Sequence, residues 1–196
     1  MKKEECLVVM AHQEELNGEL QSLDNLLITG VGKVNAAYHL AKKLTELKLS
    51  GKMPKYVINL GSAGSKHHKK GALVYCDRFI QHDMDCSAFT KNEKCQTPGD
   101  SCVILEHKSL LKDLPKGICG TGDCFVTTQK IDGRIEVVDM EAYALARVCQ
   151  KEGVDFIAIK YITDGLDAGG GSDWSAEVKN APEALYDYLM QLWKKG

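Results

Sequence analysis

Three apolar runs of strand length constrain the fold of this chain more than any other feature of its sequence. They span residues 6–11, 55–60 and 155–162, and they lack the regular alternation of apolar and polar residues that marks a strand with one face in water. Strands without that alternation are buried on both faces, as they are in parallel sheets that helices cover. The runs therefore indicate an α/β fold.

Amphipathic helical patterns separate these strands. Apolar residues recur at helical spacing in three segments, which are 33–50, 140–153 and 181–192. We expect Asn180 to cap the last helix, because Pro182 stands in its first turn. Shorter apolar runs predict further strands at 26–29, 72–76, 116–120 and 135–138, and polar residues predict loop over most of 83–113.

The order of these elements predicts the architecture. Strands alternate with helices, and no repeat or linker interrupts the 196 residues. We therefore expect a three-layer α/β/α sandwich around a mostly parallel or mixed central sheet, folded as a single domain over residues 1–196. The hydrophobic share of 44% is enough to bury a core of that size.

Charge and hydropathy argue against two classes of partner. The net charge is -2, and the densest basic run, at 66–70, is short and contains no aromatic residue, so we expect no nucleic-acid partner. No run approaches the roughly 18 to 20 apolar residues of a membrane helix. The first five residues lead into a strand instead of the apolar stretch of a signal peptide, so we expect a soluble, cytoplasmic protein.

Cysteine, histidine and glycine patterns give no sign of a metal or an organic cofactor, and we expect neither. The eight cysteines contain no C-x-x-C pair and favour free thiols. His67-His68 and His82-Asp-Met-Asp85 could bind a metal by composition, but a structural role is the better interpretation of both. Gly30-Val-Gly-Lys33 lacks the spacing of a phosphate loop and the third glycine of a dinucleotide fingerprint, so it predicts a tight strand-to-helix connection.

Carboxylates at the carboxyl ends of strands are the candidates for chemistry. Asp164 follows an apolar strand, where burial would raise its pKa and let it donate a proton near neutral pH, although it could equally cap the turn that follows. Glu141 lies at the start of a helix, and from that position alone the better interpretation is that its carboxylate caps the helix. Glu14 and Glu15 follow the first strand and could by themselves be a solvated pair. Three glycines at 169–171 predict either a hinge or a plain turn.

Several segments, taken in their order along the chain, resemble one family. They are Gly30-Val-Gly-Lys-Val34, Asn59-Leu-Gly-Ser-Ala-Gly64, Gly122-Asp-Cys-Phe125, Val138-Asp-Met-Glu-Ala-Tyr-Ala144 and Tyr161-Ile-Thr-Asp-Gly165. The chain is similar to the nucleoside phosphorylase/nucleosidase superfamily, most of all to its methylthioadenosine/S-adenosylhomocysteine nucleosidase branch. The resemblance implies hydrolysis of the N-glycosidic bond of a purine nucleoside, no cofactor, and a setting in nucleoside catabolism and methionine salvage.

The resemblance also implies roles for the residues at matching positions. Asp164 would protonate N7 of the purine, Glu15 would activate the attacking water, and Glu141 would accept hydrogen bonds from the ribose hydroxyls. The other implied substrate-binding residues are Met140 against the sugar, Phe125 stacked on the base, Val126 at the base edge, Ser62 near the sugar and water, Ala11, and Phe89. The segment from His82 to Phe89 would close the pocket of a neighbouring subunit, which implies a homodimer.

These roles are consistent with the chemistry of the bond. Cleavage builds positive charge on the sugar and negative charge on the leaving base, so an acid is needed at the base and anionic groups near the ribose. Two alternatives stay open. Phosphorolysis needs arginines around phosphate, and this chain has arginine only at 78, 134 and 147, away from the matching segments, which favours water. A nucleoside-binding module with weak turnover would not need all three carboxylates.

The chain departs from the family pattern in places that bear on specificity. His12 replaces a methionine, Lys160 or Tyr161 stands where the family has an arginine, and Thr163 replaces a serine. The segments after Glu15 and around 102–125 are shortened. These departures leave the 5′ substituent of the substrate open.

Overall fold

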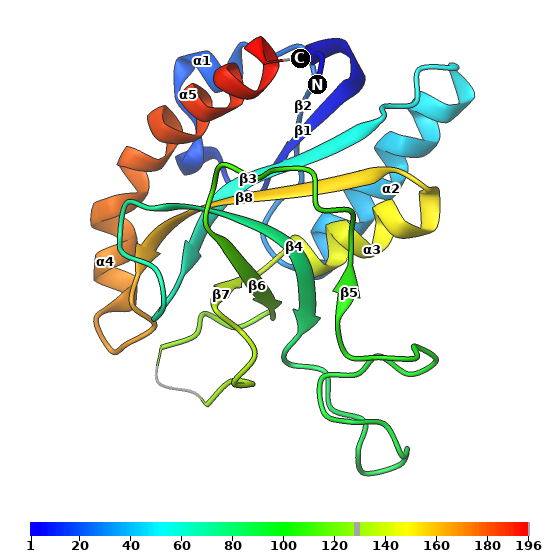
Figure 1. Ribbon diagram of the computed structural model, residues 1–196, viewed down its shortest axis with the longest axis vertical. Helices are drawn as coiled ribbons and strands as arrows, with labels where there is room; N and C mark the ends of the chain where they lie inside the picture. Colours follow the sequence, from blue (N-terminus) through cyan, green and yellow to red (C-terminus); the bar gives the residue numbers. More distant parts are fainter. Residues whose placement is uncertain (128–129, 196) are drawn as a thin grey trace.

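The computed structural model describes residues 1–127 and 130–195, and a mixed eight-stranded sheet runs through them (Figure 1). The strands are β1 (Cys6–Met10), β2 (Leu26–Ile28), β3 (Tyr56–Gly64), β4 (Leu73–Gln81), β5 (Leu105–Glu106), β6 (Lys116–Thr121), β7 (Val137–Asp139) and β8 (Asp155–Asp164). The α-helices are α1 (Gly18–Gln21), α2 (Lys33–Leu49), α3 (Ala142–Glu152), α4 (Gly170–Glu177) and α5 (Ala181–Lys194). Short 3₁₀ helices are η1 (Lys3–Glu5), η2 (Gln13–Glu15) and η3 (Val178–Asn180).

The pairing of the strands brings the carboxyl ends of several strands to one edge of the sheet. β1 pairs in parallel with β2 and β3, and β3 pairs in parallel with β8. From β8 the sheet continues through β4 and β6 to β7, and β7 returns to β3 where Val138 faces Gly64. The carboxyl ends of β1, β3 and β8 therefore meet at the place where β7 crosses, and open α/β sheets bind ligands at such an edge.

Successive side chains of β1 enter two different cores. Leu7 and Val9 pack with α2 and α3, whereas Cys6, Val8 and Met10 pack with α1 and α5. Figure 1 shows these two pairs of helices on opposite sides of the strands. Burial of both faces explains why the strand runs show no alternation. The predicted three-layer α/β/α architecture with a mixed central sheet is confirmed.

Some local predictions differ from the structure. Gly170 and Gly171 are the first residues of α4 and Gly169 is its N-cap residue, where a plain turn was one of two predictions, because packing against β8 overrides the low helix propensity of glycine. The alternative, that these glycines act as a hinge, stays a prediction. Asn180 does not cap α5: its backbone is already helical where η3 runs into α5, and its side chain donates to Glu177. The helix predicted from Met140 begins at Ala142, and β4 extends to Gln81. No helix in the described ranges has the length and hydropathy to cross a membrane.

Candidate active site

A cavity of about 260 Å³ lies at the edge where β1, β3, β7 and β8 meet. Eight residues that the sequence predicted for one site line it together: Ala11, Glu15, Ser62, Phe125, Val126, Met140, Glu141 and Asp164. They come from segments spread over most of the chain. Phe89 is not among the lining residues, and its side chain is 77% exposed on the loop after β4.

Glu15 reaches the cavity from η2 and is held by Ser62. The side chain is buried, and its Oε1 accepts hydrogen bonds from the backbone N and the Oγ of Ser62, each over 2.6 Å. Its Oε2 is buried and has no hydrogen-bond partner in the described part of the chain. The carboxylate thus has one oxygen fixed by the protein and one oxygen free for another group.

Asp164 is the last residue of β8, and only 2% of it is exposed. Its Oδ1 accepts from Leu166 N and its Oδ2 from Thr163 Oγ1, both over 3.1 Å. Burial raises the pKa of Asp164 above its usual value, and these two bonds lower it less. Asp164 therefore both caps the following turn and faces the cavity. Gly64 makes room for it, since a Cβ there would lie 2.6 Å from Oδ1.

Glu141 lies at the N-cap position of α3, but its side chain does not cap the helix, so that prediction is wrong. Asp139 supplies the cap instead, because its Oδ2 accepts from Ala142 N over 2.9 Å. Glu141 Oε1 accepts from Gly32 N over 2.9 Å, which joins the cavity to the connection before α2. Burial, together with the charge of Asp139, raises the pKa of Glu141 to about 8.

One buried cation lies beneath this group of carboxylates. The side chain of Lys160 is 1% exposed, and its Nζ lies 2.7 Å from Asp139 Oδ2. A Cβ built on Gly61 would lie 3.7 Å from that Nζ and 3.4 Å from Glu15 Oε1, so both groups approach the same stretch of β3. Burial alone would lower the pKa of Lys160, but the nearby negative groups, Asp139 foremost and Glu141 among them, together outweigh burial and hold the pKa above its usual value. Lys160 therefore stays charged.

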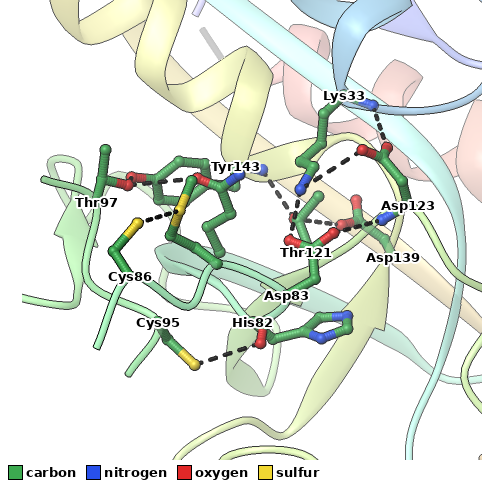
Figure 2. A network of polar contacts seen from close by, with 12 residues as sticks. Lys33, His82, Asp83, Cys86, Cys95, Thr97, Thr121, Asp123, Asp139 and Tyr143 are labelled. Carbon is green, nitrogen blue, oxygen red and sulfur yellow. Dashed lines mark hydrogen bonds and ion pairs between the residues drawn. The ribbon is translucent and has the colours of Figure 1, made fainter. Parts of the chain in front are cut away.

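Phe125 lines the cavity from the loop after β6. Ion pairs and hydrogen bonds among Lys33, Asp83 and Asp123 hold this loop in place (Figure 2). Lys33 Nζ lies 2.5 Å from Asp83 Oδ1, and Asp83 Oδ2 accepts from Asp123 N over 3.0 Å. The carboxylate of Asp123 in turn accepts from Lys33 N over 2.8 Å. These contacts tie the loop to the N-terminus of α2 and leave Phe125 43% exposed, available to a ligand.

The two aspartates singled out by their metal-like composition are engaged in other contacts, whereas the Nε2 atoms of His68 and His82 are buried without a hydrogen-bond partner in the described part of the chain. Asp83 pairs with Lys33, and Asp85 accepts hydrogen bonds from Ser87. Over residues 1–127 and 130–195, no group of three or more His, Cys, Asp or Glu side chains has a geometry that could hold a metal ion.

Other residues that line the cavity were not among the predicted site residues: Val31, Ala63, Gly64, Cys124, Val138, Asp139, Leu166 and Trp174. Trp174 is the most informative of them, since its Nε1 donates to Ser62 Oγ over 3.0 Å. Trp174 lies on α4, which the sequence did not predict because the helix begins with glycines. His12 and Thr163, which were noted as departures from the family pattern, also line the cavity. The ring of His12 meets that of Trp174 edge-on at 6.4 Å between centroids.

Comparisons with known proteins identify the family of this chain. The model of the phosphorylase superfamily matches residues 18–186. The 5′-methylthioadenosine/S-adenosylhomocysteine nucleosidase of Marinomonas sp. (strain MWYL1) is 32% identical over 184 residues, with 84% of this chain and 73% of that protein covered. The corresponding nucleosidase of Bacillus subtilis (strain 168) is 33% identical over 180 residues, with 79% and 74% covered.

The fold agrees with a solved structure as well. The 5′-methylthioadenosine/S-adenosyl homocysteine nucleosidase of Helicobacter pylori superposes with a TM-score of 0.81 at 20% identity, with 97% of this chain and 98% of that chain covered. At that identity the likeness concerns the fold alone. The match to the family model and the identity with the two curated relatives together establish that this chain belongs to the phosphorylase superfamily.

Proposed function

We propose that this protein is a purine nucleosidase. It hydrolyses the N-glycosidic bond of nucleosides of the 5′-methylthioadenosine/S-adenosylhomocysteine type and releases a free base and a ribose derivative. Its curated relatives carry that activity in their names. The observation that carries the proposal is that Asp164 and Glu15, an acid and a base from opposite ends of the chain, line one cavity.

Asp164 is the general acid in this proposal. A purine leaves more readily when N7 is protonated, because the base then departs as a neutral molecule. The raised pKa of Asp164 supports the role, since a buried carboxyl group holds its proton closer to neutral pH than an exposed one does. Phe125 would stack on the base, and Val126 would lie at the base edge.

Glu15 is the general base that activates water. Its Oε2 is the free oxygen, and a water bound there would complete the hydrogen bonding of a buried acceptor. Glu141 would accept hydrogen bonds from the ribose hydroxyls, with Met140 packed against the sugar. Ser62 and Ala11 would border the sugar and the water.

Water is the proposed nucleophile instead of phosphate. Phosphate is normally clamped by guanidinium groups. None of the three arginines is among the described residues that line the cavity. Three lysines near this region are all engaged: Lys33 with Asp83, Lys70 with Asp173 and Lys160 with Asp139.

A homodimer in the cytoplasm, with a part in methionine salvage, completes the proposal. Exposed apolar side chains support the dimer: Val34 is 78% exposed and Tyr38 is 61% exposed, one turn apart on α2. The Lys33–Asp83 pair ties the loop that carries Phe89 to the start of the same helix. In a dimer of this kind Phe89 would complete the pocket of the partner. Light scattering of the purified protein, compared with a Tyr38→Glu variant, measures the association.

The test is release of free base from a panel of purine nucleosides with different 5′ substituents, with and without inorganic phosphate. We expect release without phosphate. Two matched pairs sharpen the result: Glu15→Gln and Asp164→Asn should lose activity, whereas Glu14→Gln and Asp167→Asn, at exposed neighbouring carboxylates, should keep it. Strict dependence on phosphate would indicate a phosphorylase, and binding without release would indicate a nucleoside-binding module.

A further inference from the structure

We propose that Trp174 is a positioning residue for Glu15, acting through a chain of hydrogen bonds across Ser62. The inference rests on the proposed function, in which Glu15 activates water. The indole Nε1 of Trp174 lies 3.0 Å from Ser62 Oγ, and that Oγ lies 2.6 Å from Glu15 Oε1. The three side chains come from α4, β3 and η2, so the hydrogen bonds join segments that are distant in the sequence.

The chemistry of the donors gives this chain of hydrogen bonds one direction. An indole N–H can only donate, and an ionised carboxylate can only accept. The Ser62 hydroxyl has a single proton, and its oxygen already receives the indole hydrogen. Its own proton therefore goes to Glu15, and the Trp174 indole keeps the hydroxyl from rotating toward another acceptor in the cavity.

The direction decides which oxygen of Glu15 is left for water. Oε1 receives both hydrogens of Ser62, from the backbone N and from the hydroxyl. Oε2 is buried and without a hydrogen-bond partner in the described part of the chain. A general base must point at the proton it removes, so a carboxylate held by one oxygen keeps the other correctly aimed.

Trp174 is itself held by its neighbours on α4. Asp173 pairs with Lys70, and Glu177 accepts a hydrogen bond from Tyr161 Oη over 2.5 Å. Both contacts fix α4 against the β3–β4 connection and β8. The indole is half-buried and lines the cavity.

Kinetics of a Trp174→Phe variant test the role. Phenylalanine keeps an aromatic ring and removes only the donor, so we expect kcat to fall about threefold to tenfold, as the loss of one neutral hydrogen bond predicts, with KM changed less than about twofold. Trp193→Phe, at the other tryptophan, should match the wild type. In a Ser62→Ala background, Trp174→Phe should cause no further loss. An unchanged kcat, a change in KM alone, or additive losses would overturn the inference.

A second measurement does not depend on activity. Because the chain has two tryptophans, an isotope-labelled sample gives two indole N–H signals by NMR, and Trp193→Phe assigns them. Ser62→Ala should move the Trp174 signal upfield and leave the other in place. A Trp174 signal that does not move would overturn the inference for an active or an inactive protein. Wild-type protein that releases no base, with a signal that moves as expected, would overturn the proposed function alone.

Discussion

Replacing Lys160 by methionine should destabilise the fold strongly, because it leaves a buried carboxylate without its cation. The side chains of Lys160 and Asp139 are each 1% exposed and lie 2.7 Å apart. Removing one partner of such a pair typically costs about 3–5 kcal/mol. Asp139 keeps its hydrogen bonds from Thr121 Oγ1 and Ala142 N, so we expect a loss of about 3 kcal/mol, the lower end of that range.

Urea unfolding at a fixed protein concentration measures this loss. Lys108→Met is the matched control, since Lys108 pairs with Asp155 over 2.9 Å but its side chain is 74% exposed, and it should cost less than about 1 kcal/mol. The double variant Lys160→Met with Asp139→Asn should be more stable than Lys160→Met alone, because no unpaired charge is then buried. A single variant as stable as the control, or a double variant no better than the single, would refute this reasoning.

Three further predictions concern the cavity. Asp164→Asn should lower base release by at least about a hundredfold while nucleoside still binds in calorimetry, and near-normal turnover would remove Asp164 from its role. The pKa of Glu141 is about 8 in the folded chain against an ordinary 4.5, so the folded chain binds that proton more tightly and stability falls as pH rises between these values. The melting temperature of Glu141→Gln should therefore fall less than that of the wild type between about pH 5 and about pH 8, and parallel curves would contradict this. In Gly64→Ala the new methyl group would lie 2.3 Å from Leu166 Cδ2 and 2.6 Å from Asp164 Oδ1, so activity should fall at least about tenfold, whereas Gly18→Ala, which meets nothing within 4 Å, should leave activity unchanged.

The parts of the fold that were predicted correctly are those with a strong local pattern. The apolar runs of β1, β3 and β8 and the apolar face of α5 follow from burial alone. Glu15 and Asp164 were predicted as candidate catalytic residues because they follow the carboxyl ends of strands. The family resemblance added Phe125 and Met140 as substrate-binding residues. That residues 1–196 form a single domain stays a prediction.

The remaining features depend on contacts between distant segments. Nothing in the sequence near Lys160 indicates that its partner is Asp139, because the pair forms only once β7 and β8 lie in one closed sheet. Trp174 was missed because glycine lowers helix propensity, and only packing on β8 makes α4 a helix. Glu141 was interpreted as a cap because a carboxylate at a helix start usually is one, and the nearby Asp139 supplies that cap here.

A crystal structure of the Asp164→Asn variant with a purine nucleoside bound would test the central claim most directly. The account predicts that N7 of the base lies within hydrogen-bond distance of residue 164, and that a water on Glu15 Oε2 faces the anomeric carbon of the sugar. A base that points away from residue 164, or a sugar whose anomeric carbon lies out of reach of any water on Glu15, would contradict it.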